Sequence, residues 1–319
     1  MKKAFKIISI ILVVCIVVSG VVFGVLKKEE INYFYSAMHN ASVALSDGSW
    51  KDAGKTDGGN DAQVESAFVA GKYGGIEFKT AEDVVNYYVD AYNKTKAKTA
   101  SYIDDQGAQQ TYYAMLGTEE LKINNVLVEG KENSIINGLV PSIIDSLFSP
   151  SVYGLPPCAN RDPSQDIDEN GESMQTSRLT AEDIKNCSVK DNGDGTITVT
   201  LVPNDVQMSH KGLDAQGKVF NTLGAIDKTV DSISVLSWAS GTTADNCSVL
   251  YSKGTAVAKI DTASGEIVEA DYTANIDISV QHANVAILQD KNASLNITYK
   301  QHFPADDQYL MDSRGIKKG

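Results

Sequence analysis

The chain lacks the residue patterns that identify common enzyme classes. It has no G-x-S-x-G nucleophile elbow, no G-x-x-x-x-G-K-[ST] phosphate loop and no G-x-G-x-x-G dinucleotide loop. The histidines are scattered, and no pair has the H-x-x-x-H or H-x-x-E-H spacing that places two metal ligands on one helix face. The sequence therefore indicates no reaction, and we expect a protein without catalytic residues.

Positive charge is scarce outside the first residues. The net charge is −13, although residues 1–28 contain lysines and no acidic residue, so the remainder is more acidic than the whole. Such a surface repels phosphate backbones, which excludes nucleic acid as a partner. An acidic surface mainly keeps a protein soluble.

Cysteine is also rare, and the chain has no C-x-x-C pair, which disfavours zinc. Cys187 and Cys247 lie in identical Asn-Cys-Ser-Val tetrapeptides, each at the start of a strand-like run. They could be neighbours in a sheet, so Cys187–Cys247 is the candidate disulfide. The alternatives are a bridge that includes Cys158, or three small buried thiols.

One long apolar run lies at the N-terminus. Ile7–Leu26 carries no charge, and its length matches the ~20 residues that an α-helix needs to cross a bilayer. We expect residues 1–28 to be a single-pass membrane anchor in contact with the lipid bilayer. Lysines before the run favour a cytoplasmic N-terminus, with the bulk of the chain extracytoplasmic at the cell membrane.

Two other interpretations of this run remain open. In a cleaved secretory signal, Gly20 or Gly24 would end the small-x-small site, but an apolar region of ~7–15 residues is usual there. In a lipoprotein signal Cys15 would be modified, although the preceding Val14 is not the small residue expected at that position.

The rest of the chain divides by composition into three parts. Residues 29–74 are expected to form a juxtamembrane helix followed by a loop or stalk, because residues 46–65 are rich in Asp, Gly, Ser and Asn. Residues 75–303 form the predicted extracytoplasmic domain, and residues 304–319 a C-terminal tail.

Helices are predicted in the first part of this domain and strands in the second. Thr80 is a helix N-cap, followed by an apolar stripe at helical spacing, and further helices are expected from Pro141 and over residues 219–236. Residues 196–202 alternate as a strand, and residues 267–280 alternate over a length that requires the strand to curve or bulge. These elements predict an α+β fold: an N-terminal transmembrane helix, then a curved antiparallel β-sheet with helices packed on its apolar face.

One segment resembles a metal-binding loop. Asp166, Asp168 and Asn170 precede a glycine with the spacing of a helix–loop–helix calcium loop, which makes them a candidate calcium site. The twelfth position holds Ser177 instead of glutamate. The alternative is an acidic surface loop without any cofactor.

Three segments, 80–102 (TAEDVVNYYVDAYNKTKAKTASY), 177–201 and 251–280, together resemble an uncharacterised family of exported, membrane-anchored proteins from Gram-positive, clostridia-type bacteria. The resemblance covers residues 75–303. It implies a location in the cell envelope and no particular activity.

These observations favour a membrane-anchored extracytoplasmic binding or interaction module of the cell envelope, non-catalytic, whose partner is an apolar ligand or an envelope protein. The alternatives are an envelope scaffold or assembly protein and an envelope hydrolase.

Overall fold

A computed structural model describes residues 68–104, 106–133, 152–224, 230–231, 233, 236–285 and 288–318. This part is mostly β, with 47% strand and 15% helix, and a large antiparallel sheet dominates it. The predicted α+β class is therefore wrong. None of the helices in these ranges has the length and apolar character needed to cross a membrane. The predicted anchor at Ile7–Leu26 lies outside the described residues.

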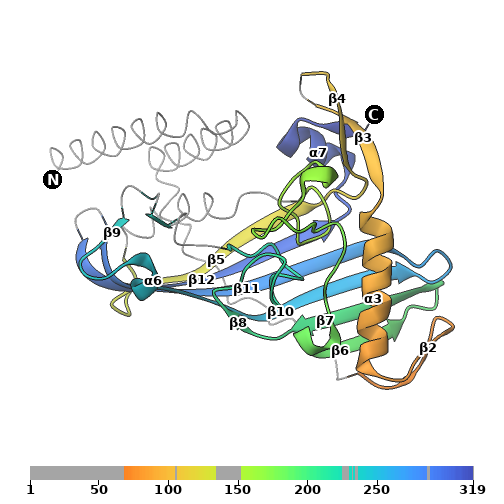
Figure 1. Ribbon diagram of the computed structural model, residues 1–319, viewed down its shortest axis with the longest axis horizontal. Helices are drawn as coiled ribbons and strands as arrows, with labels where there is room; N and C mark the ends of the chain where they lie inside the picture. Colours follow the sequence, from red (N-terminus) through yellow and green to blue (C-terminus); the bar gives the residue numbers. More distant parts are fainter. Residues whose placement is uncertain are drawn as a thin grey trace.

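The large sheet has eight strands, and every pairing within it is antiparallel (Figure 1). Its main path runs in the spatial order β5 (Thr118–Val128), β12 (Leu288–Phe303), β11 (Glu266–Val285), β10 (Cys247–Asp261), β7 (Thr196–Pro203) and β6 (Ile184–Asp191). Two short strands extend it: β8 (Val206–Gln207) pairs with β10, and β9 (Leu236–Trp238) pairs with β11.

Strand β11 confirms the predicted alternation over its middle part. From Ala270 to Ile278, every second residue is buried, because one face of the sheet packs against the core. Tyr272 and Ile276 are both within this core, whereas Asp271 is exposed. The strand therefore has the half-buried character that its sequence indicates.

The beginning of β11 corrects the predicted alternation. Strict alternation over residues 267–280 would bury Val268 on the same face as Tyr272 and expose Ile267, but Ile267 is 2% exposed and Val268 is 42% exposed. The register between β10 and β11 shifts here, because Ile260 pairs with Ile267 while the adjacent Lys259 pairs with Glu269. Val268 is the extra residue of this β-bulge, and a bulge reverses the facing of the residues on one side of it.

Further bulges interrupt the long strands. Residues Cys247–Asp261 form the single strand β10, with a register shift between Ser252 and Thr255. Lys253 lies in this bulge with a φ of 53°. On β11 the register shifts between Val280 and Ala283, around His282 with a φ of 50°. These bulges fulfil the expectation that so long a strand must bend.

Helix α3 (Ala81–Lys96) lies across strands β11, β7 and β6 (Figure 1). Thr80 is confirmed as its N-cap: its side chain accepts from the Asp83 N–H, and the Asp83 carboxylate accepts from the Thr80 N–H. The predicted stripe is buried against the sheet and contains Val84, Tyr88, Ala91 and Thr95.

The helix predicted over residues 219–236 is formed only in part where that segment is described: Val230 and Asp231 are helical. Residues 219–224 form turns and irregular backbone, and the segment's end belongs to strand β9. Val219 and Phe220 are buried in the core from this irregular backbone, so tertiary packing explains their apolar character. The helices expected over residues 29–48 and after Pro141 lie outside the described residues.

A second, smaller sheet packs beside the large one. It contains β13 (Lys317–Lys318), β3 (Thr99–Ile103) and β4 (Gln109–Tyr113), and helix α7 (Asp307–Arg314) lies next to it. Its separate core contains Tyr102, Tyr112, Leu116, Leu310 and Ile316. The described residues also contain a hairpin of β1 (Gly71–Tyr73) and β2 (Ile76–Phe78), a short helix α6 (Thr243–Asn246) and two single-turn 3-10 helices, Pro163–Gln165 and Ala181–Asp183.

Candidate functional site

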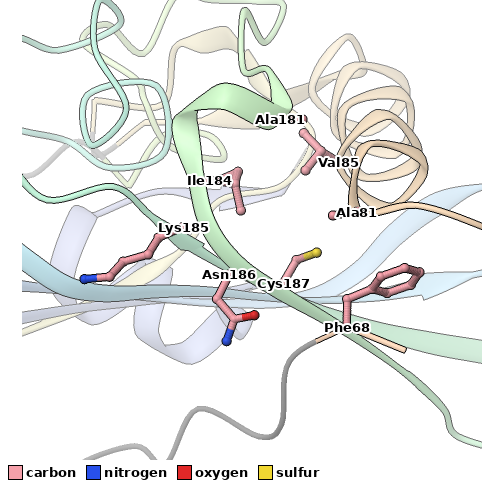
Figure 2. Close-up of a pocket in the computed structure, with 8 residues that line it drawn as sticks. All are labelled: Phe68, Ala81, Val85, Ala181, Ile184, Lys185, Asn186 and Cys187. Atoms are coloured by element: carbon pink, nitrogen blue, oxygen red, sulfur yellow. The ribbon is translucent and has the colours of Figure 1, made fainter. Parts of the chain in front are cut away.

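A small pocket lies between helix α3 and strand β6 (Figure 2). Its volume is about 250 Å³. The walls are mainly apolar and come from the chain before β1, the first turns of α3, the turn before β6 and β6 itself: Phe68, Ala81, Val85, Ala181, Ile184, Lys185, Asn186 and Cys187. Lys185 is the one charged side chain among these residues.

Strand β6 forms an edge of the large sheet beside this pocket. Among the strands that the structure describes, only β7 pairs with it. A strand with one paired side leaves alternate backbone N–H and C=O groups available on the other. Lys185 is exposed on this edge and forms an ion pair with Asp205 at 3.3 Å. Charged residues on an edge discourage aggregation without blocking the backbone groups.

The predicted Cys187–Cys247 disulfide is not formed. None of Cys158, Cys187 and Cys247 is in a disulfide, and all three side chains are buried. Cys187 lies on β6 and Cys247 begins β10, with strand β7 between them. The repeated tetrapeptide therefore occurs on two strands that are not neighbours, in the middle of β6 and at the start of β10.

The three candidate calcium ligands differ in their exposure to solvent. Asp166 and Asp168 are buried, whereas Asn170 is exposed. Burial alone would raise the pKa of Asp168, but hydrogen bonds from Arg178 and from the N–H groups of Glu172 and Asn170 outweigh it and lower the pKa. A protein cation thus occupies the position beside Asp168 that a metal ion would need.

Asp166 belongs to a buried polar cluster with Lys96, at the end of α3. Both side chains have 0% exposure, and the Lys96 Nζ lies 3.6 Å from the Asp166 Oδ2. The Lys96 ammonium also donates to the Tyr92 hydroxyl at 2.7 Å, to the Met174 carbonyl at 2.7 Å and to the Pro157 carbonyl. Burial lowers the pKa of Lys96, because it disfavours the charged form.

The Asp166 carboxylate has its own set of donors. Its Oδ1 accepts from the N–H groups of Ala159 at 2.6 Å and Asn160 at 3.2 Å. Its Oδ2 accepts from the Tyr113 hydroxyl at 2.7 Å. Cys158 lies beside this cluster, and burial raises the pKa of its thiol to about 12. No sequence pattern marked Lys96, because it lies in the polar run Asn93–Lys98.

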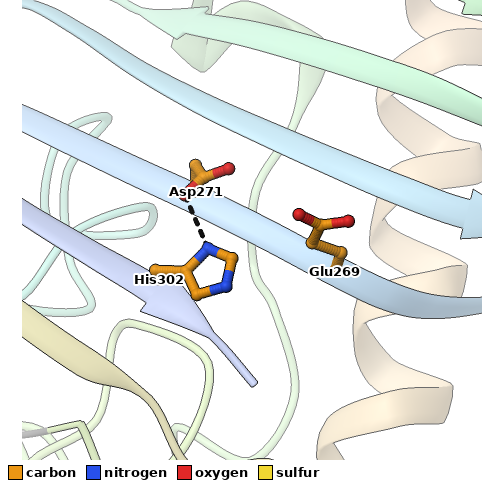
Figure 3. Close-up of side chains that lie close together, drawn as sticks. All are labelled: Glu269, Asp271 and His302. Atoms are coloured by element: carbon orange, nitrogen blue, oxygen red, sulfur yellow. Dashed lines mark hydrogen bonds and ion pairs between the residues drawn. The ribbon is translucent and has the colours of Figure 1, made fainter. Parts of the chain in front are cut away.

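A third group lies on the opposite, solvent-facing side of the sheet (Figure 3). Ligand atoms of Glu269, Asp271 and His302 lie within 4.8 Å of one another. The Asp271 Oδ1 and the His302 Nδ1 are 2.8 Å apart, across the β11–β12 ladder. Carboxylates and an imidazole can bind a divalent cation. Here they are accessible to water, and Asp271 is already paired with His302, as is usual on the wet face of a sheet.

Comparison with known proteins finds no matching family model, no similar curated protein and no similar solved structure. The function must therefore be inferred from the geometry of the chain itself.

Proposed function

We propose that the protein is a non-catalytic binding module of the cell envelope that holds an extended polypeptide segment along strand β6. The observation that carries this proposal is the position of an apolar pocket directly beside the β6 edge with which no described strand pairs. An extended peptide added to a sheet edge gains main-chain hydrogen bonds, while a pocket for an alternate side chain gives specificity.

The size of the pocket indicates what it can hold. Sites for drug-sized molecules usually have volumes of roughly 300–1,000 Å³. A pocket of about 250 Å³ between α3 and β6 is better matched to one apolar side chain than to a whole lipid. An apolar side chain of an envelope protein therefore fits the site better than a free apolar ligand.

The extracytoplasmic location in this proposal rests on the sequence. Ile7–Leu26 is an apolar segment of membrane-spanning length, and the acidic remainder of the chain is unsuited to nucleic acid. Association with the bilayer through this segment would hold the binding domain close to partners in the envelope.

The proposal can be tested with a displayed library of random linear peptides, selected on the purified full-length chain. We expect selected peptides to share one large apolar residue within a strand-forming sequence. Binding should slow hydrogen exchange of β6 amides, because peptide backbone groups would cover the edge.

Two tryptophan variants give a matched comparison. Ala81 is exposed on α3 and lines the pocket, so Ala81→Trp should fill the pocket and weaken binding at least tenfold. Asn86 is exposed on the same helix and does not line the pocket, so Asn86→Trp should leave the affinity unchanged. Failure to select any peptide, or equal binding by both variants, would refute the proposal.

A further inference from the structure

Two identical tetrapeptides frame the pocket between α3 and β6. The sequence Thr-Ala-Glu-Asp occurs at residues 80–83, where α3 begins, and again at residues 180–183, in the 3-10 helix before β6. In both copies the threonine and the aspartate form a capping box, and the two helices contact each other. Ala81 and Ala181 both line the pocket (Figure 2). The same local structure therefore occurs twice at one site.

The third residue of each tetrapeptide is a glutamate without a partner. Glu82 and Glu182 are exposed, and in the described part of the chain no hydrogen bond or ion pair engages either carboxylate. Glu82 directly follows Ala81, and Glu182 directly follows Ala181, so each side chain leaves the backbone next to a residue that lines the pocket. Neither glutamate belongs to a capping box, so the local structure does not explain them.

The other charges beside the pocket are compensated. Asp183 forms an ion pair with Lys218 at 2.9 Å, and the Asp83 carboxylate accepts two backbone N–H groups. Lys185, which lines the pocket, is paired with Asp205 at 3.3 Å. Among the described residues that directly adjoin the lining residues in sequence, the uncompensated charges are therefore negative.

We propose that the segment held along β6 is basic, with a lysine or arginine two positions from the apolar residue that fills the pocket, and that Glu82 and Glu182 bind this cation. This inference rests on the proposed function. Successive side chains of a strand point to opposite faces, so residues two positions apart lie on the same face, roughly 6–7 Å from each other. A segment whose apolar residue enters the pocket thus directs these neighbours toward the side where both tetrapeptides lie.

The carboxylates determine which segment binds more than how tightly it binds. An exposed ion pair contributes only about 0.2–1 kcal/mol, because water and salt screen it. The backbone edge and the pocket would supply most of the affinity, and complementary charge would exclude acidic segments and speed association. We expect a preference of about fivefold for a correctly placed cation, which corresponds to roughly 1 kcal/mol.

Two synthetic peptides of identical composition test the placement of the cation. TKTFTKT has lysines two positions from phenylalanine, on the same face of a strand, whereas TTKFKTT has them one position away, on the opposite face. Both are measured by fluorescence anisotropy on the full-length chain. We expect TKTFTKT to bind about fivefold more tightly, and the difference to shrink in about 0.5 M sodium chloride, because salt screens exposed charges.

Two double variants identify the carboxylates. Glu82→Gln with Glu182→Gln should remove the preference for TKTFTKT and leave the affinity for TTKFKTT unchanged. Glu120→Gln with Glu269→Gln is the matched control, because it removes two exposed carboxylates from residues that neither line nor adjoin the pocket. This control should keep the full preference.

The outcomes separate this inference from the function on which it rests. Equal binding of both peptides, weakened by Ala81→Trp, would overturn the inference and leave peptide binding at the β6 edge standing. Tighter binding of the acidic peptide TETFTET than of TKTFTKT would also overturn it, since recognition would then depend on Lys185 or on the positive end of α3. Failure of all three peptides to bind the wild-type chain would refute the proposed function together with this inference.

Discussion

The hydroxyl oxygens of Tyr88 on α3 and Tyr272 on β11 lie 2.8 Å apart inside the core. Both side chains are buried, with exposures of 2% and 1%. Burial raises the pKa of each hydroxyl, so both stay neutral and one donates to the other. This hydrogen bond links the long helix directly to the middle of the sheet.

This pair should show strong energetic coupling. Tyr88→Phe or Tyr272→Phe alone removes one hydroxyl and leaves the other buried without this partner, which should cost about 1–3 kcal/mol of unfolding free energy. The double variant leaves neither hydroxyl and should lose less than the sum of the single losses. Urea unfolding of the four proteins measures the coupling. Strictly additive losses would show that the two hydroxyls do not interact.

Because one face of β11 is buried and the other is exposed, two carboxylates added on opposite faces should differ sharply in their effect on stability. Ile276 has 0% exposure, so Ile276→Asp buries an unpaired charge and should cost about 3–5 kcal/mol. Ser279 is exposed on the same strand, and Ser279→Asp should change stability by about 0.5 kcal/mol or less. Because both variants add one negative charge, any difference between their melting temperatures comes from the position of the added carboxylate. Equal melting temperatures would contradict the strand's assigned facing.

Asp168 should contribute to acid sensitivity. The pKa of Asp168 is lower in the folded state than in the unfolded chain, where it is near 3.8. The ionised carboxylate therefore stabilises the fold fully above the pKa of the unfolded chain, and this stabilisation is lost as the pH falls through the pKa of the folded state. The Asp168→Asn variant should be less stable at pH 7, and its stability should decline less steeply below pH 4. Melting temperatures across this range test the prediction. Parallel declines of variant and wild type would contradict it.

Calcium should not stabilise this loop, because Arg178 and backbone N–H groups already engage Asp168. We expect the melting temperature to be the same with millimolar calcium and with a chelator. A rise with calcium that disappears in Asp168→Asn would restore the metal-site interpretation.

The three described thiols should be reduced and slow to react. Cys158, Cys187 and Cys247 are buried and form no disulfide, and burial raises the pKa of Cys158 to about 12. Because the thiolate is the reactive form, alkylation at pH 8 should be slow until the chain is unfolded. Peptide mapping after denaturing alkylation should give the same labelling with and without a reductant. Labelling of Cys187 that requires a reductant would reveal a bridge.

The predictable parts of this fold depend on local signals. The Thr80–Asp83 capping box and the alternation around Tyr272 depend on neighbouring residues, so the sequence alone indicates them. The bulge at Val268 follows from pairing with β10, a partner that periodicity cannot reveal. The turns around Phe220 resembled a helix because buried apolar residues happened to have helical spacing.

The candidate sites were harder to predict, because each combines distant segments. Lys96 looked like part of a solvated lysine run, and only the approach of Asp166 and Tyr113 gives it a buried partner. The pocket forms only where Val85 on helix α3 and Ile184 on the edge strand β6 come together. No spacing rule in the sequence predicts such a meeting.

The small sheet joins residues from distant parts of the chain, because β13 at Lys317–Lys318 pairs with β3 at Thr99–Ile103. During synthesis, more than two hundred residues must therefore be added after β3 before this partner exists. Contacts of such high sequence separation slow folding. The three-stranded sheet is thus completed only after elongation has passed β13.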